Sequence, residues 1–584
     1  MNSSTIAPSR QTQEVLNQAP PLTGYDLFLS DKILAKAVAR EGAEWATQQL
    51  SDLGRLLGTE EVQRWGFDAN ENEPVLYTHD RYGHRRDEVV FHPSWHNLMR
   101  ISVEHQLHSL PWVEVKKPEV KKLETEKPEA KKPEAKKPET KTAEKKKGAQ
   151  VARAALMMMT AQNEAGHTCP ISMTFSGMAA LRAEPELARE WEPRLLSSVY
   201  DPQFRPAQEK KGALMGMGMT EKQGGSDVRA NTTQAEQIGR SREYLVTGHK
   251  WFCSAPMCDA FLVLAQAPKG LSCFFLPRWT PTGERNHFHL QRLKRKMGNR
   301  SNASSEVEFA GAWAQLVGDE GRGINTIIEM VHHTRLDCAI AGAALMRQAL
   351  VQAVHHARHR KAFGKLLIDQ PLMRNVLADL TIESEAATLF MARLASSFDA
   401  RESDQQERAF SRIATAIGKY WLCKRACVQV GEALECLGGN GFVEESMMPR
   451  LYREAPLNSI WEGSGNVICL DILRALAKEP ASLDALLAEI RLPAGADPRF
   501  HAFIADVESS LVKGRNGSDS EGQARRLAEK LALALQASLL MRHGSPAVAE
   551  AFCITRLAGD HGYTFGTLPT GVDINSILAS QLDR

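Results

Sequence analysis

The chain has 584 residues, a length that predicts roughly four domains of about 150 residues each. Hydrophobic residues make up 43% of the sequence and charged residues 24%, which excludes intrinsic disorder of the whole chain. Ten cysteines in this length exclude a disulfide scaffold. No apolar run reaches the roughly 20 residues of a membrane span, and the first residues lack the features of a signal peptide. We therefore expect a cytoplasmic globular protein with no membrane partner.

A repetitive charged segment interrupts the N-terminal third of the chain. Residues 116–147 contain 13 Lys and 7 Glu in tandem pentads such as KKPEA. Its prolines remove backbone donors, and it has too little apolar surface to offset the entropy of ordering. We expect a disordered Lys/Glu/Pro insertion at 115–148, either a plain linker or a phosphate-attracting tether. The rest of the chain carries 59 basic and 63 acidic side chains, which argues against a globally basic nucleic-acid-binding protein.

Hydrophobic patterning predicts helices, then strands, then helices again. Helical spacing covers 31–57, 92–110 and 149–165. Short β-like runs bounded by Gly and Pro follow from 213 to 312. Helical spacing then returns over 323–477 and continues beyond it. We predict an α+β, mainly α, fold with an N-terminal helical domain, a β-domain, a helical bundle domain and a C-terminal helical module, at 1–212, 213–318, 319–478 and 479–584.

Two glycine-containing segments of the predicted β-domain have the composition of a ligand site. Met217–Asp227 (MGMTEKQGGSD) allows close approach of a ligand to the backbone and offers the hydroxyls of Thr220 and Ser226. Gly248–Ser254 (GHKWFCS) is a predicted strand with aromatic residues next to a small hydroxyl. Taken singly, the first is equally well explained as a turn, and the second as a buried strand with Trp251 in the core.

A third segment, Ile460–Asn466 (IWEGSGN), precedes a predicted helix at 467–477. An acidic residue there could simply favour the helix N-terminus, but Ser464 or Asn466 already supplies a cap. Glu462 lies farther back, beside Trp461, where burial would raise the pKa of its carboxyl and make it a useful base. The glycines that follow would let a flat cofactor or substrate come close.

In this order and at these distances, the three segments resemble the acyl-CoA dehydrogenase family. Arg360–Gly364 (RKAFG) is similar to the family's R-x-x-F-G motif, and Leu437–Phe442 (LGGNGF) to its GGNGF loop. The resemblance covers roughly residues 150–475. It implies an N-terminal helical domain, a central β-domain and a C-terminal four-helix domain in a homotetramer that holds FAD. The implied activity is that of an FAD-dependent oxidoreductase acting on CH–CH bonds.

The resemblance also implies roles for individual residues. Glu462 falls at the catalytic-base position of medium-chain enzymes. The alternative base position of isovaleryl-type enzymes holds Thr334, which cannot act as a carboxylate base. Arg360 and Phe363 would reach the FAD of a neighbouring subunit. The implied cofactor-binding residues are Met217, Gly218, Met219, Thr220, Gly225, Ser226, Phe252, Cys253, Ser254, Arg360, Phe363, Trp461, Gly463, Ser464, Gly465 and Asn466.

Two residues depart from the family pattern. Glu435 stands where the family usually has a Gln that meets the FAD diphosphate, and a carboxylate there is electrostatically unfavourable. Trp461 replaces the usual Tyr and would narrow the acyl pocket.

Nearly from end to end, the chain also resembles a branch of this family, the flavoproteins that bacteria induce in the adaptive response to DNA alkylation. The similar strings are Met219–Asp227, Gly298–Ser304 and Asn458–Asn466, and the C-terminal module is a feature of that branch. This implies non-specific binding of double-stranded DNA, protection from alkylating agents or their detoxification, and at most weak dehydrogenase activity. Residues 477–584 carry 11 basic and 13 acidic side chains, so binding would depend on clustered cations. The candidates are Lys513, Arg515, Arg525, Arg526, Lys530 and Arg542.

Other interpretations remain open. The cations of the module are also explained by an ordinary amphipathic face. The protein would then be a working dehydrogenase of a short or branched acyl-CoA whose module serves packing or assembly, or a flavin-free scaffold. The substrate would be an acyl-CoA or an alkylating small molecule. His355, His356 and His359 lack the Glu of a zinc-hydrolase motif, so we expect no metal site, and we expect Cys423 and Cys427 to be buried thiols.

Overall fold

The computed structural model describes residues 15–115, 144–493, 497–516 and 521–582. Most of the predicted insertion lies outside these residues. Its two flanks, β3 (Glu114–Val115) and β4 (Glu144–Lys145), pair as a short antiparallel ribbon. The chain therefore leaves the N-terminal region and returns to it at one point.

The N-terminal region is mainly helical, as predicted. Its helices are α1 (Lys32–Arg40), α2 (Thr47–Leu57), α3 (Glu60–Glu71), α4 (Pro93–Glu104), α5 (Ala149–Asn163), α6 (Thr168–Leu181) and α7 (Pro185–Leu195). The sequence did not predict the antiparallel hairpin of β1 (Val75–His79) and β2 (Arg85–Val90). Arg85 Nη2 donates to the carbonyl of Leu290 at 2.9 Å, so this hairpin ties the N-terminal helices to the central sheet.

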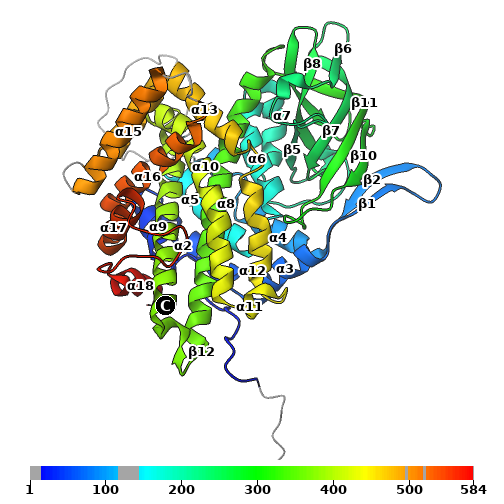
Figure 1. The fold of residues 1–584 in the computed structure, drawn as a ribbon. Helices are drawn as coiled ribbons and strands as arrows, with labels where there is room; N and C mark the ends of the chain where they lie inside the picture. Colours follow the sequence, from blue (N-terminus) through cyan, green and yellow to red (C-terminus); the bar gives the residue numbers. More distant parts are fainter. Residues whose placement is uncertain (1–14, 116–143, 494–496, 517–520, 583–584) are drawn as a thin grey trace, which may run out of the picture.

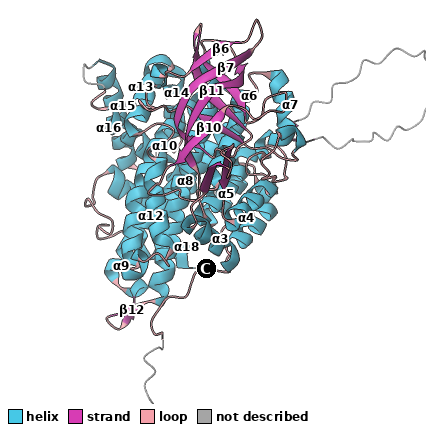
Figure 2. Cartoon of the chain, turned by 90° about the vertical axis from the view of Figure 1, so that its right-hand side faces the viewer, coloured by secondary structure: helices cyan, strands magenta, loops and turns pink. Residues whose placement is uncertain are grey.

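The β-domain is a seven-stranded sheet. Its strands are β5 (Met215–Gly218), β6 (Gln234–Gln237), β7 (Glu243–Ser254), β8 (Ala260–Ala267), β9 (Gly270–Pro277), β10 (Phe288–Leu293) and β11 (Ser304–Val317). The order is β10-β11-β7-β6-β8-β5, and β9 pairs with both β8 and β11. Strands β11, β7, β6, β8 and β9 therefore close into a ring around an apolar core. The strands lie together at one end of the molecule, with helices behind them (Figure 2).

Long antiparallel helices form the body of the molecule (Figure 1). They are α8 (Gly323–His359), α9 (Pro371–Ala400), α10 (Gln405–Cys436), α12 (Met447–Asn458) and α13 (Gly465–Lys478), with the short α11 (Gly439–Phe442) between α10 and α12. A hairpin of β12 (Lys361–Ala362) and β13 (Lys365–Leu366) joins α8 to α9. Helices α6 and α8 also contact strands of the sheet, which places the sheet beside the loop that carries Glu462.

The C-terminal module lies on the side of the long helices away from the sheet (Figure 1). It contains α14 (Pro480–Ile490), α15 (Pro498–Asn516), α16 (Ala524–His543), α17 (Pro546–Phe552) and α18 (Ile574–Leu582). Helix α16 packs on α9, α10 and α13, and the indole of Trp421 donates to Gln536 Oε1 at 2.8 Å. The module therefore shares the core of the long helices. Among the described helices, none is long and apolar enough to cross a membrane.

Candidate active site

Glu462 lies in the loop between α12 and α13, and two cations hold the backbone of this loop. Arg335 Nε donates to the carbonyl of Glu462 at 3.2 Å, and Lys419 Nζ donates to the carbonyl of Gly463. Glu462 has a φ of 58°, a left-handed conformation that non-glycine residues rarely adopt. The two cations offset the cost of that conformation, and they fix the direction in which the Glu462 side chain leaves the loop.

The carboxyl of Glu462 accepts a hydrogen bond from Thr334. Thr334 Oγ1 lies 2.6 Å from Glu462 Oε2, so the two positions considered for a catalytic base meet in space although 128 residues separate them. Burial raises the pKa of Glu462, against the opposing effects of Thr334, Arg335 and Lys419. The expected upward direction of this pKa is confirmed.

The first turn of α13 differs from the expectation. Ser464 occupies the N-cap position but makes no side-chain cap hydrogen bond, so the prediction of a Ser464 or Asn466 cap is wrong. Asn466 Oδ1 instead accepts from Arg525 Nε at 2.8 Å. Arg525, from the C-terminal module, therefore binds the Asn466 amide oxygen that was expected to cap α13.

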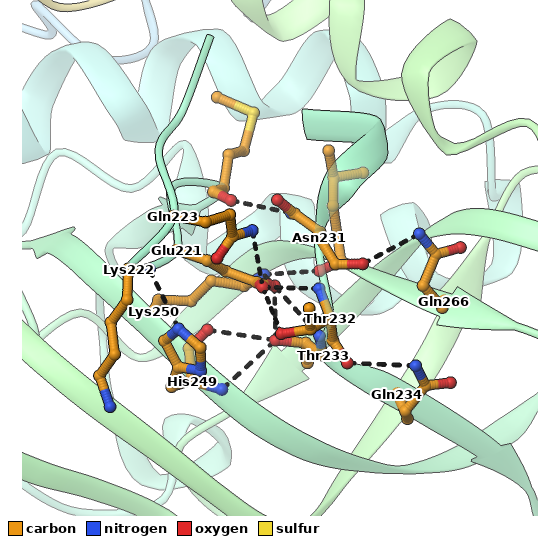
Figure 3. Close-up of polar contacts among 12 residues, drawn as sticks. Glu221, Lys222, Gln223, Asn231, Thr232, Thr233, Gln234, His249, Lys250 and Gln266 are labelled. Atoms are coloured by element: carbon orange, nitrogen blue, oxygen red, sulfur yellow. Dashed lines mark hydrogen bonds and ion pairs between the residues drawn. The ribbon is translucent and has the colours of Figure 1, made fainter. Parts of the chain in front are cut away.

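A buried ion pair joins the two glycine-containing segments of the β-domain (Figure 3). Lys250 Nζ lies 2.8 Å from Glu221 Oε1, and both side chains are fully buried. Glu221 also accepts from the backbone N–H groups and hydroxyls of Thr232 and Thr233 at 2.6–3.2 Å. Burial alone would raise the pKa of Glu221, but Lys250 and these donors hold it at about 2.

The same two segments are joined through the backbone. Trp251 N donates to the carbonyl of Thr220 at 2.8 Å. Gly248 has a φ of 150°, and a Cβ there would lie 2.6 Å from Thr233 Oγ1. Only glycine fits where β7 passes Thr233. This close approach explains why the Gly-His-Lys-Trp string begins with glycine.

Beside this support lies a surface suited to a flat cofactor. Phe252 projects from β7 and is 51% exposed. The hydroxyls of half-buried Thr220 and exposed Ser226 have no hydrogen-bond partner among the residues that the structure covers. Cys253, in contrast, is buried and its pKa is raised to about 12 by burial. A half-exposed aromatic side chain beside unpaired donors fits the FAD expected here. The Cys253 thiol lies in the core, and the Cys253 carbonyl already accepts from Ser305 Oγ at 2.8 Å.

Arg360 and Phe363, the residues expected to reach a neighbouring subunit, lie on or beside the β12–β13 hairpin. Phe363 is 99% exposed. Arg360 Nη1 donates to the carbonyl of Asn17 at 2.6 Å, and the Asn17 side chain makes two hydrogen bonds to the backbone of Lys361. The sequence interpretation missed Asn17, because nothing in the sequence links it to a hairpin 344 residues away.

The six candidate DNA-binding residues have different surroundings. Lys530 pairs with Asp506 at 2.5 Å and Arg542 with Glu489 at 2.6 Å. Arg525 bonds to Asn466, whereas exposed Arg526 has no partner in the described part of the chain. The side chains of Lys513 and Arg515 lie outside the described part of the chain. Among the candidates whose side chains the structure describes, Arg525 and Arg526 are therefore the ones without an acidic partner in the described residues.

The remaining polar clusters have ordinary partners. His355 is hydrogen-bonded to the carbonyl of Pro20 at 2.8 Å, and His359 to the carbonyl of His355. The described residues contain no group of three His, Cys, Asp or Glu side chains that could hold a metal ion. Cys423 is buried and Cys427 half-buried.

Three family models match consecutive parts of the chain. The Adaptive response protein AidB N-terminal domain matches residues 17–125 and 133–202. The acyl-CoA dehydrogenase middle domain matches residues 216–312, and the acyl-CoA dehydrogenase C-terminal domain matches residues 321–477.

Individual relatives cover nearly the whole length. AidB of Escherichia coli strain K12 is 44% identical over 93% of this chain and 94% of its own. Acyl-CoA dehydrogenase family member 11 of Caenorhabditis elegans is 29% identical over 88% of this chain and 83% of its own. The crystal structure of C. elegans ACDH-11 in complex with C11-CoA superposes with a TM-score of 0.80 at 26% identity, over 94% of this chain and 95% of that one.

The chain therefore belongs to the acyl-CoA dehydrogenase family, whose members are FAD-dependent oxidoreductases acting on CH–CH bonds. The match to the AidB N-terminal model and the 44% identity place it in the AidB branch of that family. The predicted fold class, enzyme class and cofactor are confirmed.

Proposed function

We propose that Glu462 is the catalytic base of an acyl-CoA dehydrogenase-type reaction in this protein. The observation that supports it is the half-buried carboxyl of Glu462, bonded to Thr334 and held on a loop anchored by Arg335 and Lys419. Burial raises the pKa of Glu462, so that it binds an abstracted α-proton more tightly than an exposed carboxylate would. The substrate is an acyl-CoA, as in the complex of ACDH-11.

FAD, when bound, supplies the ring that accepts the hydride from the β-carbon. The chain would hold it on Phe252 and on the hydroxyls of Thr220 and Ser226, beside the loop of Glu462. In a homotetramer, the exposed Phe363 hairpin reaches the cofactor of a neighbouring subunit. The Glu221–Lys250 pair keeps the two β-domain segments in register.

The test is single-turnover reduction of bound FAD by a panel of short, branched and medium-chain acyl-CoAs. Glu462→Gln should bind FAD normally and lose reduction by roughly two to four orders of magnitude, the usual contribution of a general base. Retention of reduction within a few-fold of wild type would refute the assignment of Glu462. Lack of reduction of the wild type by every acyl-CoA would leave an alkylating small molecule as the substrate class.

We further propose the role implied by the AidB branch. In this role the flavoprotein binds double-stranded DNA without sequence specificity, and it protects the DNA from alkylating agents or detoxifies these agents. Its dehydrogenase activity is then at most weak. Its support is the identity to AidB together with the exposed cations Arg525 and Arg526 at the start of α16. Lys530 and Arg542 are already neutralised by acidic partners, so they contribute less to phosphate binding.

The DNA affinity of the full chain should be measured as a function of salt concentration. Each lost phosphate contact reduces the slope of log K against log salt by about 0.9. Arg525→Ala with Arg526→Ala should therefore flatten the slope, whereas Lys530→Ala, the matched control, should change it little. Equal effects of both variants would contradict the placement of the site, and absence of binding at low salt would refute the DNA role.

A further inference from the structure

Thr334 makes two hydrogen bonds that a single hydroxyl cannot donate at once. Its Oγ1 lies 2.6 Å from Glu462 Oε2 and 3.1 Å from the backbone carbonyl of Val331. A hydroxyl has one proton to donate and lone pairs that accept. The direction of the Thr334–Glu462 bond therefore depends on which of the two groups carries a proton.

An ionised Glu462 can only accept, so Thr334 must donate to it and leave the Val331 carbonyl. Hydrogen bonds to charged groups are short and strong, in keeping with the 2.6 Å distance. The Val331 carbonyl loses little, because it lies inside α8 and has a helical N–H as its regular partner.

A Glu462 protonated on Oε2 reverses this arrangement. The carboxyl then donates to Thr334 Oγ1, and the Thr334 hydroxyl proton turns to the Val331 carbonyl. Both distances are satisfied in this state. The site thus has a complete hydrogen-bond arrangement before and after proton uptake, reached by rotation of the Thr334 hydroxyl and of the new carboxyl O–H.

We propose that Thr334 is a positioning residue that holds Glu462 in both protonation states and reverses its hydrogen bond when Glu462 takes up the substrate proton. In that step the acyl Cα–H bond breaks, its electron pair stays on the acyl group, and the proton forms an O–H bond on Glu462. The oxidant is the FAD of the proposed function, on which this inference rests. Threonine at the alternative base position thereby supports the carboxylate instead of replacing it.

Several charged or titratable groups face Glu462 besides Thr334. Arg335 and Asp337 project from α8, each in an ion pair, with Asp471 and Arg153 respectively. Lys419 projects from α10 to the carbonyl of Gly463. The thiols of Cys169 on α6 and Cys338 on α8 are buried, which raises the pKa of both. Thiols with pKa values raised this far stay neutral at neutral pH, so an acid limb in activity reports Glu462.

The test compares Thr334→Val, an isosteric change that removes the hydroxyl, with Thr334→Ser, which keeps it. The hydrogen bond from Thr334 lowers the pKa of Glu462, so Thr334→Val should move the acid limb of FAD reduction to higher pH. At a pH on the acid limb, the rate should fall about tenfold for the loss of one hydrogen bond to a charged group. The high-pH plateau should stay within about threefold of wild type for the loss of positioning alone, and Thr334→Ser should restore the limb.

A matched control is Thr381→Val. Thr381 is a buried α9 threonine whose hydroxyl donates to the carbonyl of Leu377 at 2.7 Å, and its loss should leave the pH profile unchanged. Infrared spectra of wild type minus Glu462→Gln, recorded without substrate across pH, isolate the protonated carboxyl band of Glu462. Thr334→Val should move the titration of that band to higher pH.

An unchanged limb in Thr334→Val, or a Thr334→Ser profile that matches Thr334→Val, would overturn the inference. Failure of the proposed function has a different signature. If Glu462→Gln still reduces FAD, Glu462 is not the base, and the infrared titration of Glu462 in Thr334→Val still decides whether Thr334 holds it.

Discussion

Replacing Lys250 with methionine would leave the buried carboxylate of Glu221 without its counter-ion. Methionine keeps most of the side-chain length and apolar packing, so the change isolates the charge. The Leu264 carbonyl, which accepts from Lys250 Nζ at 2.7 Å, would lose a donor as well. Because the pair joins the loop of Met217–Asp227 to β7, the damage should concentrate where the cofactor is expected.

The magnitude follows from what remains around Glu221. Breaking a buried ion pair by removing one partner costs about 3–5 kcal/mol. Glu221 keeps the four hydrogen bonds from Thr232 and Thr233, which stabilise a carboxylate, so we expect a loss near the lower limit, about 3 kcal/mol. Lys269→Met is the matched control. Lys269 is 76% exposed and lies 3.5 Å from Glu320, and such surface pairs contribute about 0–1 kcal/mol.

Hydrogen exchange of peptides spanning 215–254 measures the effect locally, and titration with FAD measures its consequence. Lys250→Met should exchange faster in these peptides and bind FAD more weakly, whereas Lys269→Met should match wild type in both. If peptides spanning 215–254 exchange as slowly in Lys250→Met as in Lys269→Met, the Glu221–Lys250 pair does not hold the loop of Met217–Asp227, and the reasoning fails.

Two further changes are predictable from contacts of single side chains. Burial raises the pKa of Glu385 from 4.5 to about 7. The stability that its protonated form gives the wild type is therefore fully present below pH 4.5 and is lost as pH rises from there through 7. Thermal unfolding should show Glu385→Gln equal to wild type at about pH 4 and more stable by about 3 kcal/mol at about pH 8. Asn17→Ala removes two exposed hydrogen bonds to the β12–β13 hairpin next to Arg360. Titration with FAD should show that the variant binds FAD roughly three- to tenfold more weakly. An unchanged FAD affinity would show that the hairpin needs no support from Asn17.

The elements that sequence patterning predicted well are those with one strong periodic signal. Strand β8 reads as a continuous apolar run, and its buried residues form the barrel core. Helix α8 keeps helical spacing over its whole length. The β1–β2 hairpin was missed because its strands are short and largely exposed, so they lack the alternation that identifies a half-buried strand. Contacts with β10, distant in sequence, hold it in place.

The candidate site could be predicted in its parts but not in its contacts. Glu462 was assigned from a local string, and the raised pKa followed from its apolar neighbour. Its bond to Thr334 was not predictable, since Thr334 lies in α8 and Glu462 in a loop 128 residues farther along the chain. Glu221 and Lys250 were both inside recognised motifs, yet their pairing depends on the register between a turn and β7. The expected helix cap failed for a similar reason, because Arg525 comes from another part of the chain.

The bond between Arg525 and Asn466 connects the two proposed functions. Arg525 is a candidate phosphate contact, and Asn466 lies in the first turn of α13, directly after the loop that carries Glu462. A DNA phosphate that binds Arg525 in a bidentate pair through Nε–H and one Nη–H displaces Asn466 Oδ1, because the single Nε–H then donates to the phosphate. If Asn466 then meets the cofactor, DNA binding and FAD binding alter each other's affinity, and linkage requires the two effects to be equal. Measuring FAD affinity with and without DNA, in wild type and in Arg525→Lys, would separate this coupling from a general loss of charge.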